Sequence, residues 1–97
     1  MKIYAGKSQY VAAGTTSGVT LHAKAGKVRA IFASGAASGA VTLYDNASGF
    51  TNVLLVVNVT TALPFYICLD RLMPIYFTSG LGVKTAAGVD AFIITEV

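Results

Sequence analysis

The stretch from Thr51 to Leu69 reads TNVLLVVNVTTALPFYICL, and it decides the class of fold. Its two runs of aliphatic and aromatic residues, Thr51–Val59 and Leu63–Leu69, are separated by the short break Thr60–Ala62. Such runs, bounded by turn residues, are typical of β-strands. Strands joined by short connections are expected to pair antiparallel, because a parallel pair needs a crossover of about a dozen residues or more.

The strands predicted in this stretch are apolar on both faces. Successive side chains of a strand point to opposite faces, so Val53, Leu55 and Val57 are expected on one face and Leu54 and Val56 on the other. A lone antiparallel sandwich usually has a polar outer face. Because the chain is too short for a third layer, we expect other subunits to cover its outer faces. The same pattern recurs with Phe65, Ile67 and Leu69 against Tyr66 and Cys68, and with Ala91 and Ile93 against Phe92 and Ile94.

Strand signals continue over the rest of the chain, and no segment carries the apolar stripe of a helix. Many short antiparallel strands in 97 residues predict an all-β fold. We expect one domain over residues 1–97, a compact antiparallel β-sandwich that is jelly-roll-like. The other predicted strands are Lys2–Ala5, Ser8–Ala12, Val19–Lys24, Lys27–Ser34, Ala40–Tyr44, Ile75–Thr78, Leu81–Lys84 and Val89–Glu96.

Two details of this assignment are specific enough to test against a structure. Ala25–Gly26 is expected to close a two-residue hairpin, with Gly at a position that needs positive φ. In Lys27–Ser34, alternation puts Val28, Ala30 and Phe32 on one face, with Phe32 in the core together with Leu55. Arg29, Ile31 and Ala33 are then expected on the opposite face.

The composition is apolar for so small a domain. Apolar residues make up 55% of the chain and charged residues 11%, with a mean hydropathy of +0.68. Average domains carry about 25% charged residues, so part of this surface must be apolar and is expected to meet other proteins. The alternative is that Ala and Gly raise the index while they line turns. The net charge of +3 comes from scattered residues, so we expect no nucleic-acid binding.

The single cysteine and the apolar stretches argue against disulfides, metals and membranes. Cys68 has no partner for an intrachain disulfide and is expected to be a buried, unreactive thiol. The apolar stretch Val53–Leu69 is interrupted by Asn58 and Pro64, so we expect no membrane-spanning helix. The N-terminal sequence lacks the apolar segment of a signal peptide, and we expect the chain to stay in a reducing cytosol until it is assembled.

The titratable residues offer two arrangements that could carry chemistry. Asp45 and Asp70 could form a carboxylate pair, but Asp45 lies in a turn and Asp70 precedes Arg71, where a turn cap or surface ion pair is expected. His22 and Cys68 could form a Cys–His nucleophile, but an apolar strand does not provide the exposed, electropositive setting that a reactive thiol needs. We therefore expect no enzymatic activity and no cofactor or metal.

Two segments resemble a known group of proteins. Ala40–Gly49 reads AVTLYDNASG, and Pro74–Val83 reads PIYFTSGLGV and is followed by an alternating C-terminal strand. Together they resemble small virion proteins of tailed bacteriophages, which decorate or cement capsids or line the neck and tail. In that group a strand ends in a Leu-Tyr-Asp-Asn type turn, and a later Gly-Leu pair opens the penultimate strand. The resemblance covers roughly Lys27 to Val97 in pattern.

The resemblance implies a jelly-roll or sandwich subunit of a virion. We expect a capsid decoration or cement protein, assembled in the host cytoplasm, that stabilises the shell through protein–protein contacts. Its expected partners are further copies of itself, first of all as a trimer, and the major capsid protein or other virion proteins. Neither nucleic acid nor membrane is expected as a partner. The expected contact residues are Tyr44, Asp45, Asn46, Tyr76 and Leu81.

The alternative function is a glycan- or receptor-binding sandwich of a phage tail or fibre. It requires exposed tyrosines beside polar loops, because aromatic rings stack on sugar rings while polar groups bind the hydroxyls. Aromatic residues that alternate along strands are more often core or subunit contacts. The tyrosines available are Tyr4, Tyr10, Tyr44, Tyr66 and Tyr76.

Overall fold

The computed structural model describes residues 7–35, 38–45, 50–60, 65–68 and 75–96. In these ranges the regular structure is entirely β, which confirms the all-β prediction. The strands are β1 Lys7–Val11, β2 Val19–His22, β3 Gly26–Gly35, β4 Gly39–Tyr44, β5 Val53–Val59, β6 Phe65–Cys68, β7 Ile75–Phe77, β8 Leu81–Thr85 and β9 Val89–Glu96.

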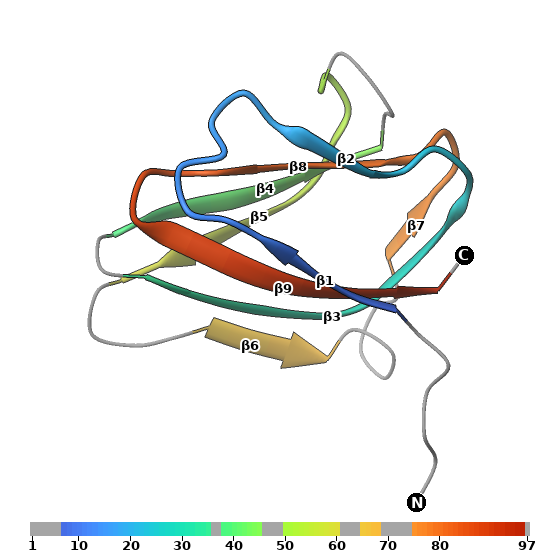
Figure 1. Ribbon diagram of the computed structural model, residues 1–97. Helices are drawn as coiled ribbons and strands as arrows, with labels where there is room; N and C mark the ends of the chain where they lie inside the picture. Colours follow the sequence, from blue (N-terminus) through green and yellow to red (C-terminus); the bar gives the residue numbers. More distant parts are fainter. Residues whose placement is uncertain (1–6, 36–37, 46–49, 61–64, 69–74, 97) are drawn as a thin grey trace, which may run out of the picture.

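The strands form two antiparallel sheets packed face to face, the two layers seen in Figure 1. One sheet has the order β1-β9-β3-β6, with the short β7 also paired to β3, and the other has the order β2-β8-β4-β5. The pairs are those of one long hairpin with its turn between β4 and β5, rolled up so that β3 meets β6, β2 meets β8 and β1 meets β9. That is the strand order of a jelly roll, so the predicted jelly-roll-like sandwich is confirmed.

Because the hairpin is rolled up, some strands joined by short connections do not pair with each other, as the sequence suggested they would. β2 and β3 are joined through Ala25 but lie in different sheets, and β2 pairs with β8. The predicted hairpin at Ala25–Gly26 is therefore wrong, and the connection arches over the end of the sandwich. The connection therefore carries the chain from one sheet to the other, and β2 and β3 face the core from opposite sides.

The core lies between the two sheets. Along β9 the side chains of Val89, Ala91, Ile93 and Thr95 are buried, and the residues between them face outward, as the period of two requires. The fully buried side chains Ile31, Leu43, Leu81, Val83 and Phe77 come from both sheets and meet them.

A bulge in β3 overturns the predicted face of Phe32. The register between β3 and β9 shifts between Val28 and Ala30, so Arg29 is an extra residue and both Val28 and Ile31 point into the core. Phe32 then lies on the outer face with 43% of its surface exposed. Its assignment to the core was wrong because strict alternation does not include bulges.

A second bulge, in β5, makes the predicted faces of that strand partly wrong. The register between β4 and β5 shifts between Leu43 and Tyr44, where Leu55 and Val53 are the paired residues. Val57 is 3% exposed and Val53 is 57% exposed, so these two do not share a face as alternation predicted. Leu55 is half-buried and packs against the core, in line with its predicted place.

Some sequence predictions fall outside the described residues. These are the strand Lys2–Ala5, Asn46, Asp70 and the burial of the Cys68 side chain. Within the described residues, no helix is long and apolar enough to cross a membrane.

Candidate functional site

Four aromatic side chains stand in a line across the outer face of the β1-β9-β3-β6 sheet. Tyr10 of β1 pairs with Phe92 of β9, Phe92 pairs with Phe32 of β3, and Phe32 pairs with Tyr66 of β6. Their exposed fractions are 52%, 47%, 43% and 63% in that order. We call these residues the aromatic row.

The rings of the aromatic row support one another but do not form a flat platform. The ring centroids of Tyr10 and Phe92 are 4.9 Å apart with planes tilted by 47°, and those of Phe32 and Tyr66 are 6.1 Å apart with a 55° tilt. Such tilted pairs are the favoured geometry of aromatic contacts. Four strands about 4.8 Å apart make the row about 14 Å wide. The row is therefore a raised, apolar ridge.

Smaller side chains lie beside this ridge on the same face. Two positions away from the row along each strand, Ser8 of β1 pairs with Ile94 of β9, and Ile94 pairs with Ala30 of β3. Two residues of a strand span about 7 Å, which is the distance from the row to this flanking strip. Ser8 is exposed, Ile94 is half-buried and Ala30 is 6% exposed, so the strip (Ser8, Ile94 and Ala30) exposes less apolar surface than the row.

A carboxylate borders the other side of the row. Asp90 accepts a hydrogen bond from the Tyr10 hydroxyl at 2.9 Å through Oδ2 and one from the Ser34 hydroxyl at 3.2 Å through Oδ1. The hydrogen bond to Asp90 is the main cause that raises the pKa of the Tyr10 phenol, since ionisation would remove the donated proton. Tyr10 is thus both the end of the row and the link to a charged group.

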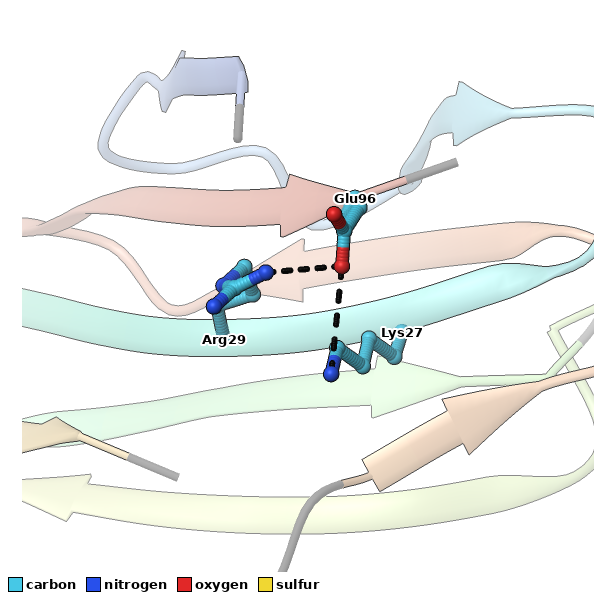
Figure 2. A network of polar contacts seen from close by, with 3 residues as sticks. All are labelled: Lys27, Arg29 and Glu96. Atoms are coloured by element: carbon cyan, nitrogen blue, oxygen red, sulfur yellow. Dashed lines mark hydrogen bonds and ion pairs between the residues drawn. The ribbon is translucent and has the colours of Figure 1, made fainter. Parts of the chain in front are cut away.

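A cluster of charged residues lies beyond the strip. Glu96 Oε1 lies 2.7 Å from Nη1 of Arg29 and 3.8 Å from Nζ of Lys27. Figure 2 shows both side chains pointing toward this carboxylate. The bulge in β3 places Arg29 here, and its side chain is only 10% exposed. We call Lys27, Arg29 and Glu96 the basic cluster, because its formal charge is +1. Tyr76, 61% exposed, pairs with Lys27, and an open depression of about 520 Å³ lies beside both.

The outer face of the second sheet carries a different set of apolar groups. Val53 and Val56 are 57% and 48% exposed and pair with Tyr44 and Thr42. We call this surface, completed by Lys84, the valine face. The Lys84 Nζ lies 5.6 Å from the ring centre of Tyr44 and 5.2 Å from that of Phe50, within cation–π range. Tyr44 is therefore half-covered by its own chain.

The other expected contact residues have distinct places. Asp45 is engaged within the chain, because its carboxylate accepts hydrogen bonds from the backbone N–H of Thr78 at 2.8 Å and of Ser79 at 2.9 Å. Leu81 is fully buried, so its prediction as a partner contact is corrected: it is a core residue. Tyr76 is exposed, and Asn46 is outside the described residues.

One member of each candidate catalytic pair, Asp70 or the Cys68 side chain, lies outside the described residues. His22 lies 2.5 Å from the Thr95 hydroxyl through Nε2, and its ring stacks on Phe77 at 5.8 Å between centroids. In this part of the chain no three His, Cys, Asp or Glu residues are grouped as metal ligands.

The aromatic row was missed from the sequence, although its tyrosines were noted. Phe32 was assigned to the core, and nothing in the local pattern indicates that residues of four separate strands share one line. Only the strand order and register bring them together.

Comparisons with known protein-family models, with curated protein sequences and with solved structures found no match for this chain.

Proposed function

We propose that this chain is a non-catalytic structural subunit of a tailed-phage virion, a decoration or cement protein that holds neighbouring subunits together. The observation that carries the proposal is the exposure of large apolar side chains on both outer faces of the sandwich. The aromatic row occupies one face, and Val53 and Val56 lie on the other.

Exposure on two opposite faces favours a subunit enclosed by neighbours over a protein with one binding site. The exposed fractions of the aromatic row leave about 400 Å² of aromatic surface in water, at about 200 Å² for a whole aromatic side chain. Apolar patches of about 300–600 Å² on a small protein are often functional. The apolar composition, with 11% charged residues, agrees with such coverage.

The architecture is compatible with this role. Jelly rolls occur in viral capsid proteins and in lectins, so the fold alone does not select between a structural and a sugar-binding function. The segments that resemble virion proteins meet in space, since Asp45 of one accepts hydrogen bonds from Thr78 and Ser79 of the other. These hydrogen bonds join Asp45 at the end of β4 to the turn between β7 and β8.

The mechanism is mechanical. A rigid sandwich that lies across the joint of two shell subunits buries apolar surface against both, and this burial opposes their separation. Specific contacts of this kind bury about 800 Å² per partner. Repetition over a shell increases the total effect through multivalency.

The experiment is co-sedimentation of the purified chain with shells of the coat protein encoded beside its gene. We expect saturable binding and a higher melting temperature of the decorated shells. Val53→Asp and Val56→Asp should each weaken binding at least tenfold, because a carboxylate would be buried without a partner.

Ala87→Asp is the matched control, since it adds the same charge at an exposed residue of the turn between β8 and β9. It should bind as the wild type does. The absence of a coat or portal gene beside this gene, or a wild-type chain that does not bind the shells, would contradict the proposal.

A glycan-binding function is the second candidate, and the contacts of Tyr10 favour it. An exposed tyrosine with a carboxylate and a hydroxyl beside it, here Asp90 and Ser34, is suited to a sugar ring. The tilts of 47° and 55° within the row oppose it, because they leave no flat surface for several sugars. Binding on a glycan array that Tyr10→Ala abolishes would select this function.

A further inference from the structure

The strand β5 has one edge without a partner strand among the described residues. It is the last strand in the order β2-β8-β4-β5, and in the described part of the chain it pairs with β4 alone. Its seven residues, Val53–Val59, include no charged residue and no proline. Such an edge is a template for a further strand, because its N–H and C=O groups can pair with those of another chain.

The other edge strands carry features that oppose such pairing. β1 begins with the charged residue Lys7. β2 is only four residues long and has a bulge between Thr20 and His22, and β6 is also only four residues long. Charges, bulges and short length are the usual devices that protect sheet edges. The bulge of β5 lies near its start, so Leu55–Val59 remains a regular and uncharged edge.

The hydrogen bonds of the neighbouring strand show which way the backbone groups of β5 point. The Ala86 N–H donates to the Ala40 carbonyl at 3.0 Å, so Ala40 directs its backbone groups to the side of β8. These directions alternate along an antiparallel strand, so the next residue, Val41, directs its groups to β5. Its partner there is Val57. The backbone groups of Val57 therefore point to β4.

The residues on either side of Val57 have free backbone groups. By the same alternation, Val56 and Asn58 direct their N–H and C=O groups away from β4. These two residues form a set that is complementary to itself. When a second β5 lies antiparallel, with Val57 opposite its own copy, Val56 of each strand faces Asn58 of the other. Each of the two facing pairs can then exchange two hydrogen bonds, as hydrogen-bonded antiparallel pairs do.

We propose that two copies of this chain pair edge to edge through β5, about a two-fold axis that passes perpendicularly through the sheet at Val57. The strands then form one continuous sheet in the order β2-β8-β4-β5-β5-β4-β8-β2. Every contact occurs twice, as in any isologous interface.

The properties of β5 favour a copy of itself as the partner. On the core side, Leu55 of one strand faces Val59 of the other, and both side chains are aliphatic. Because β5 carries no charge, the symmetric arrangement brings no like charges opposite each other across the strands. The assembly is also closed, since the other edge of β5 is occupied by β4 and one copy therefore uses the free edge completely.

The size of the contact predicts a weak pair. The molecule measures 19 Å along its thinnest dimension, and a strand of seven residues is about 24 Å long. The contact is thus about 450 Å² per copy, compared with about 800 Å² in a standard interface. We therefore expect a dissociation constant on the order of 100 μM, in the range of transient contacts.

The pairing goes beyond the proposed function and does not depend on it, but it suits that function. Because the axis is perpendicular to the sheet, the two valine faces lie on the same side of the continuous sheet. Val53 and Val56 of both copies then form one surface. A shell that binds this surface holds the two copies close together, which strengthens a weak pair through the effective concentration.

Amide hydrogen exchange measured by NMR tests the pairing directly. Between about 20 μM and about 1 mM protein, exchange at the N–H groups of Val56 and Asn58 should slow at least threefold, because pairing occupies these groups. The N–H groups of Val57 and Val59 are the internal control. They point to β4 and should be protected equally at both concentrations. Equal exchange of Val56 and Asn58 at the two concentrations would overturn the pairing.

Sedimentation velocity with a proline variant tests the role of the free backbone groups. The wild-type chain of 10.0 kDa should approach about 20 kDa as its concentration rises toward about 1 mM. Asn58→Pro removes one outward N–H and no hydrogen bond to β4, which is the position where an edge strand accepts proline. It should raise the dissociation constant at least tenfold, and circular dichroism should show that the variant stays folded.

A charge exchange tests the register. Val56→Lys combined with Asn58→Lys places like charges opposite each other and should abolish the pair. Val56→Lys combined with Asn58→Glu places opposite charges there and should retain it. Thr42→Lys combined with Ala87→Lys adds two positive charges away from the free edge, on β4 and in an exposed turn, and should leave pairing unchanged. Equal loss of pairing in both edge variants would overturn the register centred on Val57.

The outcomes separate this inference from the proposed function. A wild type that stays monomeric at about 1 mM, or a pair that Asn58→Pro does not weaken, would overturn the edge pairing. Shell binding by such a monomer would leave the proposed function standing. A pair that binds no shell would contradict that function alone.

Discussion

The carboxylate of Asp45 accepts three hydrogen bonds from Thr78 and the residue after it. Oδ1 accepts the backbone N–H of Thr78 at 2.8 Å and of Ser79 at 2.9 Å, and Oδ2 accepts the Thr78 hydroxyl at 3.0 Å. These contacts join the end of β4 to the turn between β7 and β8. This turn connects the two sheets, because β7 and β8 belong to different ones. A residue expected to contact a partner is thus a clamp within the chain.

Asp45→Asn is expected to lower stability by about 1 kcal/mol, which corresponds to a decrease of about 4–8 °C in melting temperature. The backbone hydrogen bond from Ser79 is the first cause that lowers the pKa of Asp45. A lowered folded-state pKa gives stability that is present above the unfolded value of about 3.9 and is lost as the pH falls through the folded value. The difference between wild type and variant should therefore shrink below about pH 4 in thermal melts. A difference that stays constant down to pH 2 would contradict the clamp.

Tyr10 and Asp90 should be coupled in the alkaline range. Because the hydrogen bond to Asp90 raises the pKa of Tyr10, the folded state gains stability below the unfolded value of about 10 and loses it as the pH rises through the folded value. In a spectrophotometric titration of the phenols, Tyr10→Phe should remove a component at high pH, and Asp90→Asn should shift that component to lower pH. An unchanged curve for Asp90→Asn would exclude the coupling.

Truncation of two neighbouring residues of β3 should lower the stability by very different amounts. Ile31 is fully buried, so Ile31→Ala is expected to cost about 2–5 kcal/mol. Phe32 is 43% exposed, and Phe32→Ala should cost about 1 kcal/mol or less in a dilute solution of single chains. Urea unfolding at low protein concentration measures both values. Equal losses would place Phe32 back in the core.

Two glycines provide a matched test of backbone packing. A Cβ on Gly35 would lie 2.2 Å from the carbonyl oxygen of Gly88, at the turn between β8 and β9. A Cβ on Gly14, whose φ is +77°, would meet nothing within 4 Å. Gly14→Ala should therefore cost only the left-handed backbone penalty of about 1–2 kcal/mol. Gly35→Ala should cost more than that, because backbone atoms must move apart. Urea unfolding of both variants checks this order, and the reverse order would refute it.

Local patterns predicted the strands well, because β-branched residues, aromatic residues and turn glycines act within a few positions. The runs at Val19–Lys24, Ala40–Tyr44 and Val89–Glu96 each match a strand of the structure to within two residues at either end. The candidate site was harder to predict from the sequence than the strands were. Tyr76 was correctly placed on the surface, but Leu81 is buried and Phe32 is exposed. The bulge at Arg29 reverses the alternation in β3, and no local signal marks it.

The sequence by itself determined an all-β chain with apolar residues on both faces of its strands, since composition and alternation are properties of neighbouring residues. Only the tertiary structure decided which strands pair and in which register. Tyr10, Phe32, Tyr66 and Phe92 come from four strands far apart in the chain, and they form one row because rolling the hairpin makes β1, β9, β3 and β6 neighbours in one sheet. Register depends on burial of the opposite faces of those strands, which is a property of the whole sandwich.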